Sequence, residues 1–141
     1  MLVYIALMLT VIISCQVKQT KSDSSDINII SVNPVHITED ISDPALQMAC
    51  QYWNLSTEQV KQFFLLSDKM DTNPYQAFYQ LPCSINGKLK ADNQLWSFTI
   101  NAGATATWTT KDNTQTRYFG CKKTACKPLV LLSYDGMNPD S

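Results

Sequence analysis

The sequence predicts an α+β domain in which two short helices precede an antiparallel β-meander of about five strands, braced by disulfides. Apolar residues recur at helical spacing between residues 43 and 73, whereas apolar and polar residues alternate from residue 83 onward. Five cysteines are present, and four of them lie within these two regions. A chain of 141 residues is long enough for one domain. We divide it into a signal peptide at 1–14, a flexible tether at 15–42 and the domain at 43–141.

The first predicted helix begins at Asp43-Pro44. An aspartate can accept hydrogen bonds from the free N–H groups of a helix start, and a proline at the next position loses no bond there. Four apolar residues then follow at i, i+3, i+4 and i+7 and form one stripe: Leu46, Ala49, Cys50 and Trp53. We therefore expect Cys50 to face the core.

The second predicted helix begins at the capping box Ser56-Thr57-Glu58-Gln59. In this motif the Ser56 hydroxyl accepts from the Gln59 N–H, and the Gln59 side chain accepts from the Ser56 N–H. The buried face of the helix is expected to contain Val60, Phe63 and Phe64. The helix should end by Asn73-Pro74, because proline disfavours the helical conformation of the residue before it.

Five strands are expected after the helices, at residues 83–90, 96–101, 104–109, 117–119 and 129–132. Their alternating pattern indicates a sheet with one buried and one wet face, and polar or glycine-containing turns separate the first four. The large aromatic residues follow helical or alternating spacing. We therefore expect core positions rather than a ligand groove for Trp53, Tyr75, Phe78, Tyr79, Trp96 and Trp108. The tail from Asp135 is expected to be loose.

The cysteine count indicates an exported domain in an oxidising compartment. If Cys15 carries a modification, the remaining four cysteines are the even number that two disulfides require. Four cysteines allow three pairings, of which we favour Cys121 with Cys126, across a short loop, and Cys50 with Cys83. The C-x4-C spacing and the distant single histidine, His36, are not typical of a redox or zinc site. We expect no metal and no other cofactor.

Residues 1–13 form an almost wholly apolar run without a charged side chain. The run is shorter than the roughly 20 residues that cross a bilayer, and it has the length of a signal-peptide core. It ends in Ile12-Ile13-Ser14-Cys15, which resembles the lipobox of bacterial lipoproteins. The resemblance implies lipid attachment at Cys15, cleavage before it, and acyl chains such as palmitate that anchor the protein in a membrane. Gln16, where aspartate would retain such a protein in the inner membrane, favours the outer membrane.

Two alternatives remain open near the N-terminus. The apolar run lacks the usual Lys or Arg before it, so an ordinary cleaved signal or a short uncleaved anchor is the alternative to a lipoprotein signal. Residues 16–42 carry a net charge of −2 and show no sustained period, which predicts the tether. A strand at residues 27–32 that pairs with the domain is the alternative for that segment.

The titratable residues provide no recognisable catalytic set. His36 lies in the expected tether, and the carboxylates that could act in pairs lie on polar faces or in turns: Glu58, Asp68, Asp71, Asp92 and Asp112. We therefore expect no enzyme, and a small hydrolase is the least favoured function. From residue 43 onward nine Lys and Arg stand against eight Asp and Glu, which lacks the broad basic field of a nucleic-acid-binding protein.

Three lysines, Lys122, Lys123 and Lys127, crowd the loop that Cys121 and Cys126 would close. They are candidate contacts for anionic lipid headgroups or an acidic partner, and the alternative is that they keep an exposed loop soluble. The segments 96–103, 118–121 and 128–132 resemble small bacterial exported proteins for which no function is known, so this resemblance implies no mechanism.

These features together predict a lipid-anchored protein of the bacterial cell envelope with a non-catalytic binding domain. The expected partners are the membrane, through the anchor, and an envelope or extracellular protein that the domain binds as an inhibitor or immunity-type factor. The alternative is a structural or stress-related lipoprotein that contacts lipid or cell wall through the three lysines.

Overall fold

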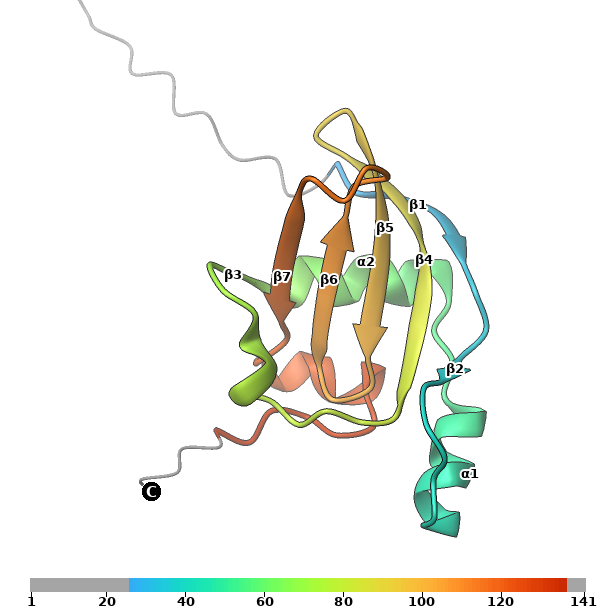
Figure 1. Cartoon of the computed structure of the whole chain (residues 1–141). Helices are drawn as coiled ribbons and strands as arrows, with labels where there is room; N and C mark the ends of the chain where they lie inside the picture. Colours follow the sequence, from blue (N-terminus) through green and yellow to red (C-terminus); the bar gives the residue numbers. More distant parts are fainter. Residues whose placement is uncertain (1–25, 137–141) are drawn as a thin grey trace, which may run out of the picture.

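The structure is a computed structural model that describes residues 26–136. It contains a seven-stranded antiparallel sheet in the order β1-β4-β5-β6-β7-β3, with β2 also paired to β4 (Figure 1). The strands are β1 (Asn28–Val32), β2 (His36–Ile37), β3 (Asp68–Met70), β4 (Cys83–Ala91), β5 (Gln94–Asn101), β6 (Thr105–Thr109) and β7 (Thr116–Gly120). The helices are α1 (Pro44–Tyr52) and α2 (Thr57–Leu66), with the 3₁₀ helices η1 (Pro74–Gln76) and η2 (Thr124–Leu129).

The four central strands form the predicted meander. Strand β4 pairs with β5, β5 with β6, and β6 with β7, each antiparallel to the next. The β4–β5 hairpin turns at Asp92 and Asn93, whose φ angles of 53° and 56° are those of a two-residue type I′ turn. Four of the five predicted strands are therefore confirmed, whereas the sheet as a whole is larger than five strands.

The expected tether is wrong for the part of it that the structure describes. Strands β1 and β2 both pair with β4, so residues 28–37 belong to the sheet and form its edge. Ile29 is buried in the core, and this apolar contact explains why a mostly polar segment becomes ordered. The strand alternative for residues 27–32 is thus the correct one. The signal peptide and Cys15 lie outside the described residues.

The fifth predicted strand, at residues 129–132, is also wrong. This apolar segment runs from the end of η2 across the end of the meander, where Leu131 and Leu132 donate backbone hydrogen bonds to the carbonyl of Ala102. Leu129 is buried and its carbonyl accepts from the Trp53 indole at 3.1 Å. Leu129 and Val130 therefore pack into the core without joining the sheet, whereas Leu131 and Leu132 are exposed, and the hydrogen-bond partners of the segment are loop and helix groups.

Both predicted helix starts are confirmed. The Asp43 carboxylate accepts from the Ala45 N–H at 2.9 Å, and Ser56 and Gln59 form the reciprocal capping box. Helix α2 ends at Leu66, before the predicted limit at Asn73-Pro74, and residues 68–70 turn back as the edge strand β3 beside β7. This short strand was not foreseen, because three residues carry no readable period.

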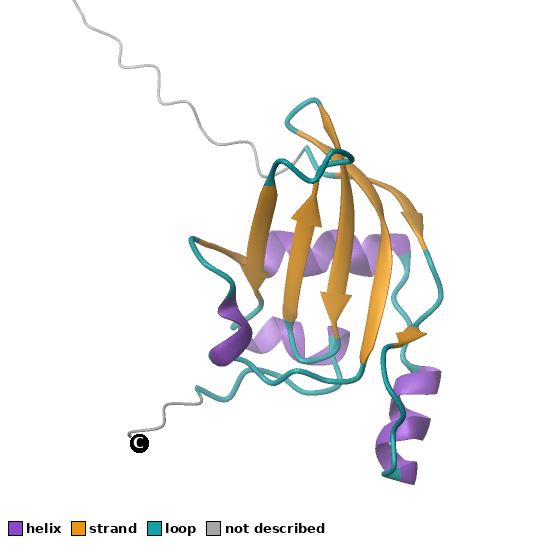
Figure 2. Cartoon of the chain, in the orientation of Figure 1, coloured by secondary structure: helices purple, strands orange, loops and turns teal. Residues whose placement is uncertain are grey.

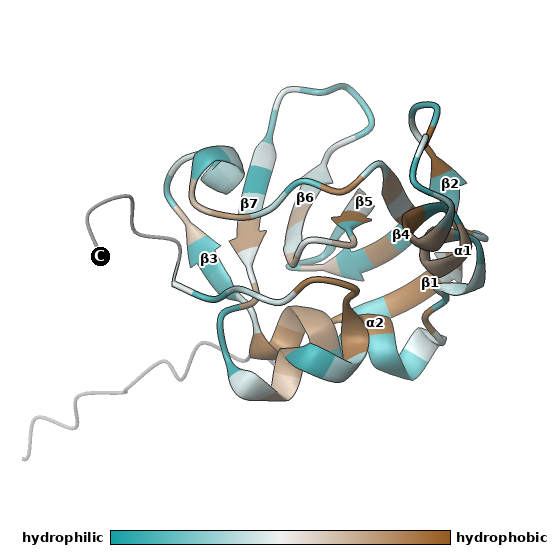
Figure 3. Ribbon diagram, turned by 90° about the horizontal axis from the view of Figure 1, so that it is seen from below, coloured by the Kyte–Doolittle hydropathy of each residue, from teal (hydrophilic) through white to brown (hydrophobic). Residues whose placement is uncertain are grey.

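The core lies between one face of the sheet and α2 (Figures 1 and 2). Phe64 of α2 occupies its centre, with ring centroids 5.6 Å from Phe98, 5.2 Å from Trp108 and 5.4 Å from Phe119. All three contacts are edge-to-face, the geometry that the charge distribution of aromatic rings favours. Colouring by hydropathy shows apolar and polar segments in turn along α2 (Figure 3), and Val60, Phe63 and Phe64 are its buried residues.

The two favoured disulfides are both present. Cys50 pairs with Cys83, which links α1 to the start of β4. Cys121, directly after β7, pairs with Cys126 within η2. All four cysteines are buried.

The aromatic residues divide into two groups. Trp53, Phe78, Trp96 and Trp108 are buried, as expected. Tyr75 is 61% exposed, so the expectation of a core position is wrong for it, because it lies on η1 at the edge of the domain rather than on a strand. Tyr79 is half-buried, and its pKa is raised because its hydroxyl donates a hydrogen bond of 2.6 Å to the Asp135 carboxylate.

Candidate binding face of the sheet

The two faces of the sheet differ in what covers them. Helices α2 and η2 lie behind the sheet in Figure 1, and neither crosses the front of β5, β6 and β7. We name this front the uncovered face, and its side chains from these strands are Leu95, Ser97, Thr99, Thr105, Thr107, Thr109, Thr116 and Tyr118. Its members follow from the alternation of each strand, because the residues between them point into the core. Apart from Thr105, which is buried, these side chains form a face rich in hydroxyl groups that is available to solvent.

The hydroxyl groups of this face are matched across the strands. Thr99 lies opposite Thr107, and Ser97 lies opposite Thr109. Thr109 in turn lies opposite Thr116 on β7. Side chains in such pairs are close neighbours, about 4.5 to 5.5 Å apart at their Cβ atoms. The strands therefore present a two-dimensional array of hydroxyl groups rather than isolated ones.

A hollow of about 180 Å³ lies where this face meets η1. We name it the polar hollow. Its lining consists of Asn73, Pro74, Tyr75, Gln80, Thr99, Asn101, Thr105, Ala106 and Thr107, and none of these side chains carries a formal charge at neutral pH. The residues come from η1, from the loop after it, and from β5 and β6, so only the tertiary fold assembles them.

Asn101 holds the walls of the polar hollow in place. Its carboxamide oxygen accepts from the N–H groups of Leu81 at 3.0 Å and Gly103 at 2.8 Å, and its NH₂ donates to the Leu81 carbonyl at 2.8 Å. At Gly103 a Cβ atom would lie 1.9 Å from the Tyr79 carbonyl oxygen, so the loop approaches the β5–β6 turn as closely as only glycine allows. Asn73 caps η1 by accepting from the Tyr75 N–H at 3.0 Å.

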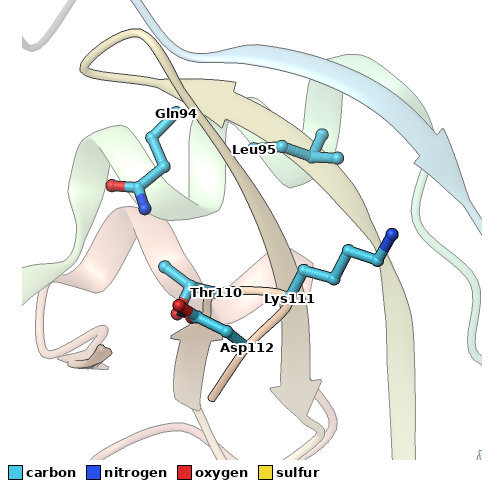
Figure 4. A pocket seen from close by; sticks show the side chains of 5 residues that line it. All are labelled: Gln94, Leu95, Thr110, Lys111 and Asp112. Atoms are coloured by element: carbon cyan, nitrogen blue, oxygen red, sulfur yellow. Dashed lines mark hydrogen bonds between the residues drawn. The ribbon is translucent and has the colours of Figure 1, made fainter. Parts of the chain in front are cut away.

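Two larger hollows border the same face. One, of about 550 Å³, is lined by Gln94, Leu95, Thr110, Lys111 and Asp112 (Figure 4). In it the Asp112 carboxylate accepts from the Thr110 hydroxyl at 2.6 Å and the Thr114 hydroxyl at 2.9 Å. These hydrogen bonds lower the pKa of Asp112, which marks it as a charged residue that organises the turn. The other hollow, of about 510 Å³, lies between β3 and β7.

A fourth hollow, of about 230 Å³, opens at the end of the core between α2 and the sheet. Arg117 lies over the Trp96 ring, 4.4 Å from its centroid, and forms an ion pair of 2.6 Å with Asp92. Within residues 26–136 the buried Trp108 indole N–H, which also borders this hollow, has no hydrogen-bond partner. The Arg117 guanidinium closes the end of the aromatic core, and this arrangement is a structural one.

The three lysines singled out by the sequence are exposed, Lys122 and Lys123 in the loop that the Cys121–Cys126 disulfide closes and Lys127 in the last turn of η2. Lys122 lies 5.4 Å from the centroid of the Tyr134 ring. None of the three lysines lines the polar hollow, and η2, which carries Lys127, lies on the same side of the sheet as α2 (Figure 1). The structure thus separates the lysine loop from the uncovered face.

The catalytic candidates are all exposed. Glu58, Asp68, Asp71, Asp92 and Asp112 are exposed, as is His36 on the edge strand β2. Among residues 26–136 no group of three or more His, Cys, Asp and Glu side chains comes together as a metal site. The sequence does not predict the polar hollow, and the alternate threonines at 105, 107 and 109 are the only local pattern that indicates a polar face there.

No helix within residues 26–136 combines the length and the apolar character needed to cross a membrane. Comparison of the chain with protein-family models, with curated proteins and with solved structures finds no match.

Proposed function

We propose that this chain is a lipid-anchored protein of the bacterial cell envelope whose domain is a non-catalytic binding module. Gln16, directly after Cys15, favours the outer membrane as its location. An inhibitor or immunity-type factor that binds an envelope or extracellular protein is the form of this function that the sequence favours. The anchor rests on the apolar run at residues 1–13 and on the lipobox-like Ile12-Ile13-Ser14-Cys15. The even number of remaining cysteines, all paired, supports Cys15 as the modified one.

The observation that carries the binding role is the uncovered face. A sheet face that neither α1 nor α2 covers contributes little to stability over most of its area, yet this one is hollowed at three places and ordered by hydrogen bonds. The disulfides and the capped helices hold the strands behind it rigid, and rigidity lowers the entropic cost of binding. The scattered, exposed carboxylates support a non-catalytic role.

A photo-crosslinking experiment in the intact, anchored chain tests this role. A benzophenone side chain is placed at Thr99, on the uncovered face, and in a matched chain at Gln62, which is equally exposed on α2. We expect a discrete adduct from position 99 and none from position 62. The absence of an adduct from position 99, or the same adducts from both positions, would contradict a binding role for this face.

The anchor is tested separately. Replacing Cys15 by Ser removes the thiol that would carry the lipid, so the protein should move from the membrane pellet to the soluble fraction after cell fractionation. The Cys50→Ser, Cys83→Ser variant, which keeps Cys15, is the control and should remain in the pellet. A Cys15→Ser protein that stays in the membrane pellet would rule out lipidation.

A second candidate function rests on the exposed lysine loop. Lys122 and Lys123 lie within the loop that the Cys121–Cys126 disulfide closes, and Lys127 directly follows it. Each lysine near an anionic bilayer surface contributes about 1 kcal/mol of attraction. A structural or stress-related lipoprotein would use this segment to hold the domain against lipid or cell wall. Co-sedimentation with anionic vesicles or purified cell wall, comparing the triple Lys→Ser chain with a Lys88→Ser, Lys90→Ser control, separates the two functions. Equal sedimentation of both would exclude the lysine loop.

A further inference from the structure

We propose that the polar hollow is a carbohydrate-binding site that takes one ring of a neutral glycan. The inference rests on the proposed function, since it requires the uncovered face to be a binding surface. It adds the chemical class of the ligand and the residues that recognise it. Five side chains carry the argument: Tyr75, Gln80, Thr99, Thr105 and Thr107.

The charge of the lining favours a neutral ligand. Every side chain around the polar hollow is an amide, a hydroxyl, a phenol or an aliphatic group. Phosphates, nucleotides and carboxylates are recognised through Arg, Lys or converging N–H groups, and cationic ligands through carboxylates. A site without either kind of charge suits a molecule that offers many hydroxyl groups and no net charge.

The free hydrogen-bonding groups match the edge of a sugar. Within residues 26–136 the hydroxyl groups of Thr99 and Thr107 have no protein partner, and they lie opposite one another on β5 and β6. Gln80 makes one long contact, from its NH₂ to the Thr105 hydroxyl at 3.4 Å, which a ligand hydroxyl could replace. A hydroxyl both donates and accepts, so this set can pair with vicinal sugar hydroxyls in either direction.

Tyr75 supplies the apolar half of the site. It borders the polar hollow and is 61% exposed, so its ring is accessible to a ligand. The C–H groups on the face of a sugar ring carry partial positive charge, and they pack favourably against the negative face of an aromatic ring. Pro74 adds further apolar surface at the same hollow.

The size of the polar hollow fits one ring. At about 30 Å³ for each water molecule in the liquid, its 180 Å³ holds about six waters, the volume that a single hexose displaces. The hydrogen bonds of Asn101 and the cap of η1 order the walls in the free protein, so ligand binding carries no entropic cost for ordering them.

The face beyond the polar hollow extends the site. Thr107, Thr109 and Thr116 continue the hydroxyl array along β6 and onto β7, toward the hollow beside Gln94 and Thr110 that Figure 4 shows. Successive residues on one face of a strand are about 6.6 to 6.8 Å apart. A linear glycan can therefore follow the strands, with one ring in the polar hollow and its neighbours over the threonines.

Titration of the isotope-labelled full chain in detergent tests the inference, with cellotetraose, maltotetraose and tetra-N-acetylchitotetraose as probes. We expect at least one probe to give saturable shifts of the backbone amide signals of Gln80, Thr99 and Thr107. Tyr75→Ala should weaken that binding about tenfold, the size of one lost aromatic contact. The matched control Tyr52→Ala removes a tyrosine that is 77% exposed on α1, away from the hollow, and should bind as the unchanged chain does.

Two results would overturn the inference. Either no probe at millimolar concentration shifts the amide signals of the residues around the hollow, or the Tyr75→Ala and Tyr52→Ala variants bind the probe equally well. The double variant Thr99→Val, Thr107→Val is a second test that keeps the shape and removes the hydroxyls, and it should lose binding. The crosslinking experiment separates the two levels. A protein adduct from position 99 without any glycan binding would overturn the carbohydrate site and leave the proposed function standing. If there is no adduct and no glycan binding, both the carbohydrate site and the proposed function are overturned.

Discussion

The two faces of the same sheet have opposite compositions and, we infer, opposite tasks. On β5, Trp96, Phe98 and Ile100 are buried in the core, whereas Ser97 and Thr99, which alternate with them, are exposed. The covered face obtains its stability from the removal of large apolar side chains from water. The uncovered face makes few such contacts, so its side chains are free to serve binding. The following predictions test that division, beginning with the largest effect.

Phe64→Ala should be the most damaging single change. Phe64 is the residue of α2 that contacts Phe98, Trp108 and Phe119 at once, and its removal leaves a cavity in the centre of the core. Truncation of a buried Phe typically lowers the free energy of unfolding by about 3 to 5 kcal/mol. Urea denaturation followed by tryptophan fluorescence measures the loss. A loss below about 1 kcal/mol would mean that α2 does not provide the core of this domain.

The two disulfides should differ in their contributions. Cys50–Cys83 spans 33 positions and Cys121–Cys126 spans 5, so the loop-entropy model gives about 3.7 kcal/mol for the first and about 2 kcal/mol for the second. Double Cys→Ala variants, compared by urea denaturation under the same conditions, measure both values. Equal losses would show that packing of the buried sulfurs, rather than loop length, sets the contributions.

Asp112 should make a small, pH-dependent contribution beside the uncovered face. Hydrogen bonds from Thr110 and Thr114 lower its pKa from 3.8 in the unfolded chain, so the charged form is stabilised on folding. That stability is fully present above pH 3.8 and is lost as the pH falls through the lower pKa of the folded protein. We therefore expect Asp112→Asn to lower the Tm at pH 7, and the difference from the unchanged chain to shrink below pH 3.8. A difference that does not vary with pH would contradict this role.

Thr99→Val together with Thr107→Val should have the smallest effect on folding. Both residues lie on the uncovered face, valine is equally suited to a strand, and such surface changes usually alter stability by no more than about 0.5 kcal/mol. The same urea experiment as for Phe64→Ala makes the comparison direct. A loss comparable to that of the core variant would break the division between a stabilising face and a binding face.

The sequence by itself determined the features that depend on neighbours along the chain. Asp43 and Ser56 predicted where the helices begin, because a cap is a contact over two or three residues. The alternation at 83–109 predicted three central strands and which side chains they bury, because the period of a strand is local. The cysteine count and the short Cys121–Cys126 spacing led to the correct pairing.

Only the tertiary structure decided the features that depend on distant partners. Residues 28–32 form an edge strand because they pair with β4. Residues 129–132 do not form a strand, because Leu131 and Leu132 donate to the Ala102 carbonyl and the Leu129 carbonyl accepts from the Trp53 indole. The polar hollow joins Tyr75 to threonines more than 20 positions away on β5 and β6. Such contacts form only when the sheet packs on its core, so no local pattern of residues predicts them.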